Sequence, residues 1–179
     1  DSIYQNIYTI EREDPDYVLI LAGDHLYKMD YAKMLQAHVE SGADVTVGVV
    51  DLPKEEGRHF GVLELVAKDR VVGFEEKPLH PKTLPEWPDL ICASMGIYIF
   101  SRDLLAQQLE ADHEKPDSTR DFGNDILPPL IKTRRVFAYH FGESHGRVSP
   151  DNYWRDVGSI DSYYTANMDL LKPVPPLNL

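Results

Sequence analysis

The sequence predicts an α/β protein, a three-layer α/β/α sandwich around a mixed, mostly parallel sheet. Short runs rich in strand-forming residues, such as 44–50 (DVTVGVV), alternate with longer segments whose apolar residues recur at helical spacing. Two consecutive strands, 60–66 and 71–75, are separated by a short turn and indicate a hairpin, which makes the sheet mixed. The remaining alternation of strands and helices favours parallel neighbours with helices on both faces of the sheet.

The predicted strands are bounded by residues that favour turns. The first strand follows Asp14-Pro15-Asp16, a segment that breaks the helix before it. The strand at 93–100 lies in an almost wholly apolar stretch. The predicted strands are 17–22, 44–50, 60–66, 71–75, 93–100 and 136–141.

The predicted helices carry capping signals at their ends. Gly42 stands where a C-cap is expected, and Ser101 and Ser159 are expected N-cap residues. Pro128-Pro129 is expected to bend or interrupt the helix that contains it. The predicted helices are 1–12, 30–41, 101–110, 121–132 and 159–171, and the segments 79–89 and 112–120 are predicted loops.

Composition excludes several classes of partner. The formal net charge of -12 argues against a nucleic-acid partner, because a phosphate backbone needs a basic face. It does not exclude a small anionic ligand, since a few local cations can dominate a pocket. No apolar run approaches about 20 residues, so no membrane span is predicted. The single cysteine, Cys92, excludes a disulfide within the chain, favours a reducing compartment and is interpreted as inert core.

Two acidic residues are expected at the edge of the sheet where ligands bind. Asp24 follows the first strand, and ligands of open α/β sheets bind outside the carboxyl ends of the strands. Gly23 would permit a sharp turn or the close approach of a ligand. Asp156 lies in the segment YWRDVG before the last helix. Two carboxylates at one edge could hold one Mg²⁺, which completes its coordination with waters or phosphates.

Each aspartate also has a purely structural interpretation. Asp24 could cap the turn toward the helix at 30–41, and this alternative would be favoured if Asp24 stood alone. Asp156 could belong to a surface Arg–Asp pair, and that alternative is about as good as the functional one.

Lys77 and Glu76 fit a phosphorylated sugar, and Ser94 and Gly61 are further candidates that have structural alternatives. Lys77 would bind a phosphate as a point charge, and Glu76 would accept hydrogen bonds from sugar hydroxyls. The structural alternative for this pair is a solvated hairpin end. Ser94, inside an apolar strand, is either a satisfied core hydroxyl or a ligand contact. Gly61 indicates a bulge or a close approach of backbone, which again could be only structural.

Other catalytic patterns are set aside. The seven histidines show no spacing typical of metal ligands, and the chain has no P-loop and no G-x-S-x-G segment. Asp121-Phe122-Gly123 matches a tripeptide of protein kinases, but no H-R-D segment precedes it, so the match is attributed to chance.

Several segments that stand in order along the chain are distinctive together. GDHLYKMDY, SMGIYIF and YWRDVGSIDSYY are the most specific, and DSIYQNIYTI, HFGVLEL, GFEEKP and STRDFGNDILP accompany them. This series resembles the ADP-glucose pyrophosphorylases (glucose-1-phosphate adenylyltransferases) of the sugar nucleotidyltransferase superfamily. The resemblance spans nearly the whole chain and implies the Rossmann-like fold of the nucleotide-diphospho-sugar transferases.

The resemblance also implies a reaction and roles for particular residues. The family converts ATP and glucose 1-phosphate to ADP-glucose and pyrophosphate with Mg²⁺, in an allosteric enzyme of glycogen or starch biosynthesis. Asp24 and Asp156 resemble its catalytic, metal-binding aspartates. Lys77 resembles the lysine that holds the phosphate of glucose 1-phosphate. The other residues that match contacts to glucose 1-phosphate are Gly61, Glu76 and Ser94.

The resemblance implies further segments outside this sequence. The family's glycine-rich nucleotide loop lies upstream of the segment at which this chain starts, so the sheet is expected to be incomplete at the N-terminus. Residues 1–171 are expected to be the C-terminal part of the nucleotidyltransferase catalytic domain, and 172–179 the linker toward a β-helix domain. The full-length protein is expected to be a homo- or hetero-oligomer, a tetramer, in the bacterial cytoplasm or in a plant plastid.

Two other functions stay open at the level of sequence. One is a non-catalytic regulatory subunit that binds sugar phosphate and modulates a partner; the residues Asp24, Lys77 and Asp156 favour an enzyme over it. The other is a metal-dependent glycosyltransferase, which would need a D-x-D carboxylate pair after a strand. The segment GDH does not supply that pair.

Overall fold

The part of the chain that the computed structural model describes, residues 2–142 and 153–177, forms two sheets with helices around them. The strands are β1 (Tyr17–Ile20), β2 (His25–Tyr27), β3 (Val45–Pro53), β4 (Gly61–Val66), β5 (Arg70–Glu76), β6 (Leu90–Ser101), β7 (Val136–His140) and β8 (Trp154–Asp156). The helices are α1 (Ser2–Gln5), α2 (Ile7–Glu13), α3 (Tyr31–Ser41), α4 (Arg102–His113), α5 (Leu127–Thr133) and α6 (Ile160–Leu170), with 3₁₀ turns η1 (Lys54–His59) and η2 (Ala67–Asp69) and a π-helical turn η3 (Phe122–Ile126).

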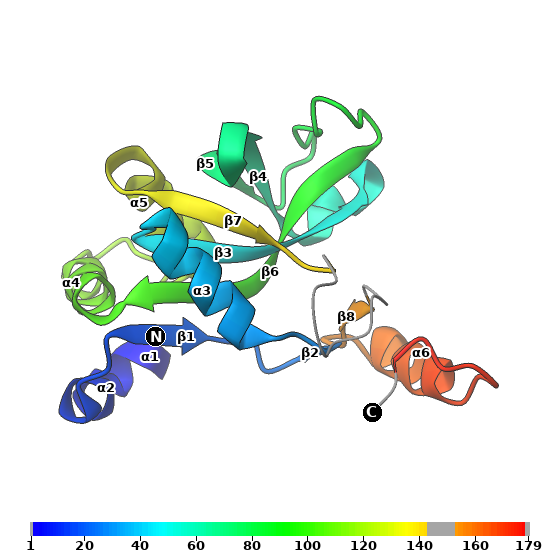
Figure 1. The fold of residues 1–179 in the computed structure, drawn as a ribbon, viewed down its shortest axis with the longest axis horizontal. Coiled ribbons are helices and arrows are strands. Elements are labelled where there is room, and N and C mark those ends of the chain that lie inside the picture. The colour runs from blue at the N-terminus through cyan, green and yellow to red at the C-terminus, as the bar shows by residue number, and fades with distance from the viewer. Residues whose placement is uncertain (1, 143–152, 178–179) are drawn as a thin grey trace.

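The main sheet has six strands in the order β1-β6-β3-β7-β5-β4, and a small separate sheet pairs β2 with β8 (Figure 1). The mixed α/β class is confirmed. The expectation of a mostly parallel sheet is wrong for the described residues, where only the β3–β7 pair is parallel. Strand β6 is the reason: it is entered from the loop after the β4–β5 hairpin and not from a crossover helix, and it runs antiparallel to β1 and β3.

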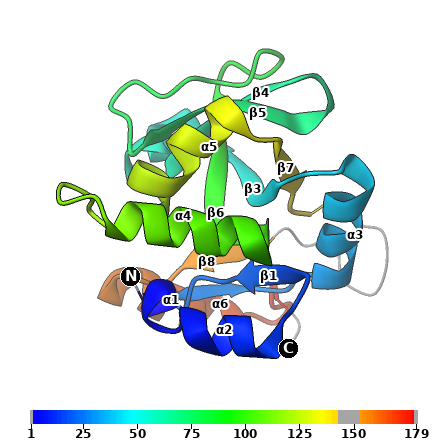
Figure 2. The ribbon, with the colours of Figure 1, turned by 90° about the vertical axis from the view of Figure 1, so that its left-hand side faces the viewer.

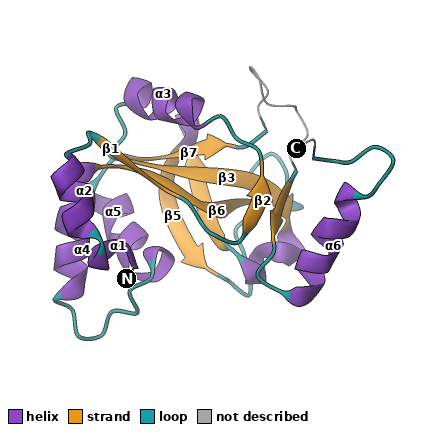
Figure 3. Cartoon of the chain, turned by 90° about the horizontal axis from the view of Figure 1, so that it is seen from below, coloured by secondary structure: helices purple, strands orange, loops and turns teal. Residues whose placement is uncertain are grey.

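Helices cover both faces of the main sheet, as the three-layer prediction requires (Figures 2 and 3). On one face, Met34 of α3 is buried with Ile97 and Ile99 of β6. On the other face, Leu105 of α4 is buried with Phe100 of β6. Successive residues of β6 therefore face opposite sides of the sheet, which explains why its sequence is apolar almost throughout.

Two predicted helices are divided in the structure. The segment predicted as one helix over 1–12 forms α1 and α2, with Asn6 between them. The segment 121–132 forms η3 and then α5. Pro128 and Pro129 stand in the first turn of α5, directly after η3, so the helical segment changes its geometry where the prolines were expected to bend or interrupt it. None of the helices in the described residues combines the length and apolarity needed to cross a membrane.

The capping predictions are largely confirmed. Gly42 ends α3 in the left-handed conformation. The hydroxyl of Ser159 accepts a hydrogen bond from the backbone N–H of Ser162 and begins α6. Ser101 precedes α4 as predicted, but its side chain makes no capping hydrogen bond.

Strand β6 is longer than predicted and carries a bulge. The partners of β6 on β3 jump from Gly48↔Ile97 to Val49↔Ser94, which leaves Met95 and Gly96 unpaired in this ladder. Gly96 has a φ of +67°, a conformation that favours glycine. The bulge lets one strand pair with β1 near its end and with β4 near its start.

Cys92 is fully buried on β6, as the sequence predicts for a core residue. Burial raises the pKa of its thiol to about 12, because the thiolate loses its hydration there. The thiol therefore stays protonated and unreactive near neutral pH.

His38 of α3 is also fully buried, and its Nδ1 lies 2.7 Å from the hydroxyl of Thr46. Burial lowers the pKa of His38 below its usual 6.5, while the carboxylate of Asp44 opposes part of that shift. A neutral buried histidine contributes stability that is present above the unfolded pKa and is lost as the pH falls below it.

We therefore expect the protein to lose more unfolding free energy between pH 7.5 and pH 5.5 than its His38→Gln variant does, by on the order of 1 kcal/mol at most. Urea unfolding of both proteins, followed by tryptophan fluorescence at the two pH values, measures this difference. Equal losses in the two proteins would show that His38 does not titrate as its burial requires.

Candidate active site

Asp24 lies between β1 and β2, past the carboxyl end of the first strand as the sequence predicts, and its side chain is 59% exposed. The N-cap of α3 is Asp30, whose carboxylate accepts from the N–H of Ala32, so Asp24 does not cap that helix. Gly23 is not required by its surroundings, since a Cβ there would meet no atom within 4 Å and its φ is not left-handed.

The two-stranded sheet brings Asp156 to Asp24. In this antiparallel ladder His25 pairs with Asp156, and the backbone N–H of Val157 donates to the carbonyl of Asp24 at 2.8 Å. Neither β2 nor β8 was predicted, because each has only three residues and shows no periodicity. The ladder therefore fixes two loops from opposite ends of the chain against each other.

The carboxylates of Asp24 and Asp156 converge at Gly158. The N–H of Gly158 donates to Oδ1 of Asp156 at 2.7 Å. A Cβ built on Gly158 would lie 3.0 Å from Oδ1 of Asp156 and 3.2 Å from Oδ2 of Asp24. Both oxygens thus border one small space that only a glycine leaves open.

The alternative for Asp156, a surface pair with Arg155, is not what the structure shows. Arg155 lies over the ring of Tyr153, 4.7 Å from its centroid, and its Nε is 3.8 Å from Asp169. Asp156 is therefore left to face Asp24.

Asp24 and Asp156 line a cavity of about 670 Å³. Phe60 and Trp154 line it, and their rings lie 5.2 Å apart between centroids. Among the described residues Trp154 Nε1 is buried without a hydrogen-bond partner. The ring of His25 packs against Trp154 at 5.0 Å, and its Nε2 is 3.7 Å from Asp24. The aromatic side chains form one wall and hold the aspartate loop.

The residues predicted to bind the sugar phosphate gather at the adjoining ends of β4 and β5. Gly61 pairs with Glu76 across the hairpin, and a Cβ on Gly61 would crowd the ring of Phe74 and lie 3.0 Å from Glu76 Oε2. Gly61 is thus required for packing. Lys77 follows with a left-handed φ of +47°, which is rare for a residue with a side chain, and its ammonium lies 3.7 Å from Glu76.

Ser94 lies beside this group on β6 and is buried. Its hydroxyl is 3.4 Å from the hydroxyl of Tyr98 and accepts from the N–H of Gly96 at 3.3 Å. Burial raises the pKa of Tyr98 to about 12, and the charges of Asp121 and Glu76 add to the shift. Ser94 is therefore a hydroxyl with partners in the core that also lies beside the charged group.

Asp121 is the residue that the sequence interpretation missed. A Cβ on Gly123 would lie 2.5 Å from Glu76 Oε2 and 3.2 Å from Asp121 Oδ1, so the two carboxylates are neighbours. Burial raises the pKa of Glu76, the charge of Asp121 raises it further, and Lys77 opposes both. The tripeptide at 121–123 had been attributed to chance; its position just before a helical segment was the available signal.

One residue joins the two halves of the site. The backbone N–H of Lys77 donates to the carbonyl of Phe60 at 3.1 Å, and Phe60 lines the cavity of the aspartates. All six predicted site residues thus lie in one region, the aspartate pair on one side of Phe60 and the residues Gly61, Glu76, Lys77 and Ser94 on the other.

The donor set around Gly158 suits a cation that keeps open coordination positions. Across residues 2–142 and 153–177, no three His, Cys, Asp or Glu side chains gather as a metal-binding group. Two carboxylates alone match Mg²⁺, which takes one or two protein carboxylates and fills its octahedron with waters and substrate phosphates. A site for zinc would need more nitrogen or sulfur ligands.

The fold and the site together define an α/β protein with two convergent carboxylates at the edge of its sheet, where ligands of open α/β sheets bind. More particularly, the chain belongs to the nucleotidyl transferase family, because residues 1–173 match the family model described as Nucleotidyl transferase. This match confirms the resemblance inferred from the sequence segments.

The chain is also similar over its whole length to several curated proteins. It is 52% identical to "Glucose-1-phosphate adenylyltransferase 2" of Vibrio parahaemolyticus and 51% identical to "Glucose-1-phosphate adenylyltransferase" of Methylobacillus flagellatus. It is 49% identical to the protein of that name from Dechloromonas aromatica. The chain spans 44%, 42% and 41% of the lengths of these three relatives, so it corresponds to less than half of each.

The space at Gly158 gives a direct test of the carboxylate pair. We expect Gly158→Ala to weaken the binding of Mn²⁺, used as a spectroscopic substitute for Mg²⁺, by about tenfold, because the new methyl group lies between the two carboxylates. Electron paramagnetic resonance titration measures the free ion.

The matched control is Gly23→Ala, in the other loop of the pair, where a methyl group meets nothing within 4 Å. It should leave Mn²⁺ binding unchanged. Equal affinities in the Gly158→Ala variant and the unaltered protein would count against a cation between the aspartates.

Proposed function

We propose that this chain carries the sugar-phosphate and metal half of a glucose-1-phosphate adenylyltransferase site, which makes ADP-glucose and pyrophosphate from ATP and glucose 1-phosphate. The observation that carries the proposal is the convergence of Asp24 and Asp156 at Gly158, with Lys77 bonded to the neighbouring Phe60. The names of the relatives support the choice of substrates.

The reaction would be a single displacement at phosphorus. A phosphate oxygen of glucose 1-phosphate attacks the α-phosphorus of ATP, the new P–O bond forms, and the bond to the bridging oxygen of pyrophosphate breaks. No covalent intermediate with the protein is needed, so the chain contributes by positioning reactants and by offsetting charge.

The two aspartates would hold Mg²⁺. When bound, the ion supplies positive charge against the α-phosphate and the departing pyrophosphate. The residues of the chain hold the carboxylates in place for it: the N–H of Gly158 orients Asp156, and the β2–β8 ladder orients Asp24. The chain as a whole carries a net charge of -12, so the ion would add positive charge where the phosphates gather.

Lys77 and Glu76 would divide the recognition of glucose 1-phosphate between them. Lys77 is 60% exposed, so its ammonium is available to the phosphate of the sugar. Glu76 is more buried, lies beside Asp121, and has acceptor oxygens suited to sugar hydroxyls. The left-handed backbone at Lys77, with a φ of +47°, would let both side chains reach one ligand.

We extend the proposal to the organisation of the protein. Residues 1–171 are proposed as part of the catalytic domain and 172–179 as a linker toward another domain, in an oligomer of the full-length protein. The family match over residues 1–173 supports the first assignment.

Lys77→Ala should raise the KM for glucose 1-phosphate roughly 10- to 100-fold, because a charge-assisted bond to phosphate is lost, with a smaller fall in kcat. Pyrophosphate release by the complete gene product measures both constants. Lys132→Ala, an exposed lysine at the end of α5, is the control and should change neither. An unchanged KM in Lys77→Ala would refute the role of Lys77.

Asp24→Asn should lower kcat by at least about a hundredfold at saturating Mg²⁺, since it removes a charged ligand and keeps the shape of the side chain. Normal turnover of this variant would contradict the metal role.

If the unaltered gene product binds glucose 1-phosphate but releases no pyrophosphate with ATP, UTP, dTTP or GTP, the regulatory-subunit alternative is correct.

A further inference from the structure

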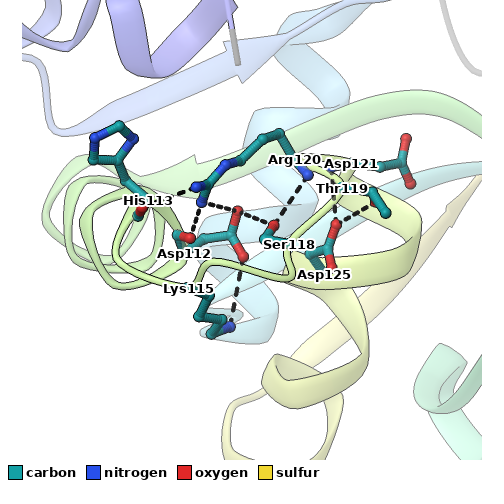
Figure 4. Close-up of polar contacts among 8 residues, drawn as sticks. All are labelled: Asp112, His113, Lys115, Ser118, Thr119, Arg120, Asp121 and Asp125. Atoms are coloured by element: carbon teal, nitrogen blue, oxygen red, sulfur yellow. Dashed lines mark hydrogen bonds and ion pairs between the residues drawn. The ribbon is translucent and has the colours of Figure 1, made fainter.

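A network of polar contacts closes the C-terminal end of α4 (Figure 4). Asp112 is buried in the last turn of this helix. Its Oδ2 accepts from the hydroxyl of Ser118 at 2.7 Å, and Lys115 lies 3.5 Å from its other oxygen. The segment 114–121, which leads from α4 to η3, is thus fastened to a buried carboxylate.

Arg120 contacts the same end of α4 through its guanidinium. Its Nη1 donates to the backbone carbonyl of Asp112 and lies 3.5 Å from the carboxylate of the same residue. Its Nη2 donates to the carbonyl of His113 at 2.9 Å. One guanidinium therefore binds the carbonyls of two residues at the end of α4, where the carbonyl of Asp112 also accepts from the N–H of Lys115. Its charge faces the negative end of the helix dipole.

The backbone of Arg120 is held in an unfavourable conformation. Its φ is +63°, in the left-handed region that residues with a Cβ rarely adopt. Its N–H donates to the hydroxyl of Ser118 at 3.0 Å. The contacts to Asp112 and His113 offset the cost of this conformation, so the segment keeps a shape that it would not take by itself.

The residue after Arg120 is Asp121, the neighbour of Glu76. Asp121 caps η3 by accepting from the N–H of Asn124 at 2.9 Å, and its own N–H donates to Asp125 at 3.1 Å. Thr119 donates to the same carboxylate of Asp125 at 2.6 Å. Asp121 is therefore fastened on both sides along the chain.

These hydrogen bonds are needed to hold Asp121 in place, because Asp121 and Glu76 repel each other when both are ionised. Their oxygens lie on either side of the space at Gly123, and the burial of Glu76 strengthens the repulsion. A loose segment would swing Asp121 away into water. The contacts of Arg120 to α4 oppose this motion directly.

We propose that Asp112 and Arg120 are positioning residues, which hold Asp121 beside Glu76 and so set the affinity for the sugar of glucose 1-phosphate. The link to affinity rests on the proposed function. Two adjacent carboxylates offer several acceptors to the hydroxyls of one sugar ring, and they do so only while the segment 118–121 keeps its place. Neither Asp112 nor Arg120 touches the ligand.

The variant Arg120→Gly tests the role of the Arg120 side chain separately from that of its backbone conformation. Glycine adopts a φ of +63° without strain, so this variant removes the guanidinium and its bonds and adds no backbone strain. In the complete gene product we expect the KM for glucose 1-phosphate to rise about tenfold, with the KM for ATP and kcat changed by less than about twofold. The KM of Arg120→Lys for glucose 1-phosphate should lie between those of the unaltered protein and Arg120→Gly. The ammonium of lysine cannot bond two carbonyls and a carboxylate as a guanidinium does.

Two further variants keep the test decisive. Ser118→Ala removes a single hydroxyl from the same network and should give a smaller rise in the same KM, whether or not Arg120→Gly folds well. Arg12→Gln, in the last turn of α2 with its ion pair to Glu13, is the control and should match the unaltered protein. A KM for glucose 1-phosphate within twofold of the unaltered protein in both Arg120→Gly and Ser118→Ala would overturn the proposal.

A second measurement separates this proposal from the proposed function. Hydrogen–deuterium exchange of the segment 114–125 needs no enzymatic activity, and it should be at least about tenfold faster in Arg120→Gly than in Arg12→Gln. Absence of pyrophosphate release in the unaltered protein would end the proposed function alone. Unchanged exchange in Arg120→Gly would end the positioning role alone.

Discussion

The short ladder between β2 and β8 is the contact on which the candidate site depends. It joins two loops from opposite ends of the chain, and the bond from Val157 to the carbonyl of Asp24 extends it by one more residue. Two carboxylates repel, so their convergence at Gly158 needs backbone bonds that hold the loops together regardless of side-chain charge. Packing of Trp154 against His25 and Phe60 buries apolar surface at the same place and adds to that restraint. A cation between the carboxylates would remove their repulsion. The arrangement is therefore costly without an ion and favours the binding of a cation.

The second half of the site is built from strained backbone on a rigid sheet. Lys77 and Arg120 both have left-handed φ values. Lys77 directly follows Glu76 and Arg120 directly precedes Asp121, and the carboxylates of Glu76 and Asp121 are neighbours. Such conformations persist only where surrounding bonds impose them. For Lys77 the bond is to Phe60, which also lines the cavity of the aspartates, so the two halves of the site share one backbone segment. The bulge at Gly96 serves the same region, since it bends β6 and places Ser94 beside β4.

Sequence reasoning located the charged residues better than it located their supports. Asp24 and Asp156 were predicted because each stands in a loop beside glycine at an expected sheet edge, and the structure brings them together. The strands β2 and β8 could not be predicted, since three residues carry no period and their stability comes from packing on Trp154. The direction of β6 could not be predicted either, because it depends on which strand the chain meets after the long loop at 79–89. Asp121 was missed because its role comes from a spatial neighbour, Glu76, that no local pattern reveals.

The central claim is that Asp24 and Asp156 share one divalent cation. A double-mutant cycle on Mn²⁺ affinity, with Asp24→Asn, Asp156→Asn and the double variant, tests it most directly. If the two carboxylates ligate the same ion, either single variant loses most of the Mn²⁺ affinity. The double variant then binds Mn²⁺ only slightly more weakly than the weaker-binding single variant. If the two losses in binding free energy simply add, each carboxylate acts on its own, and the account of one shared ion is wrong.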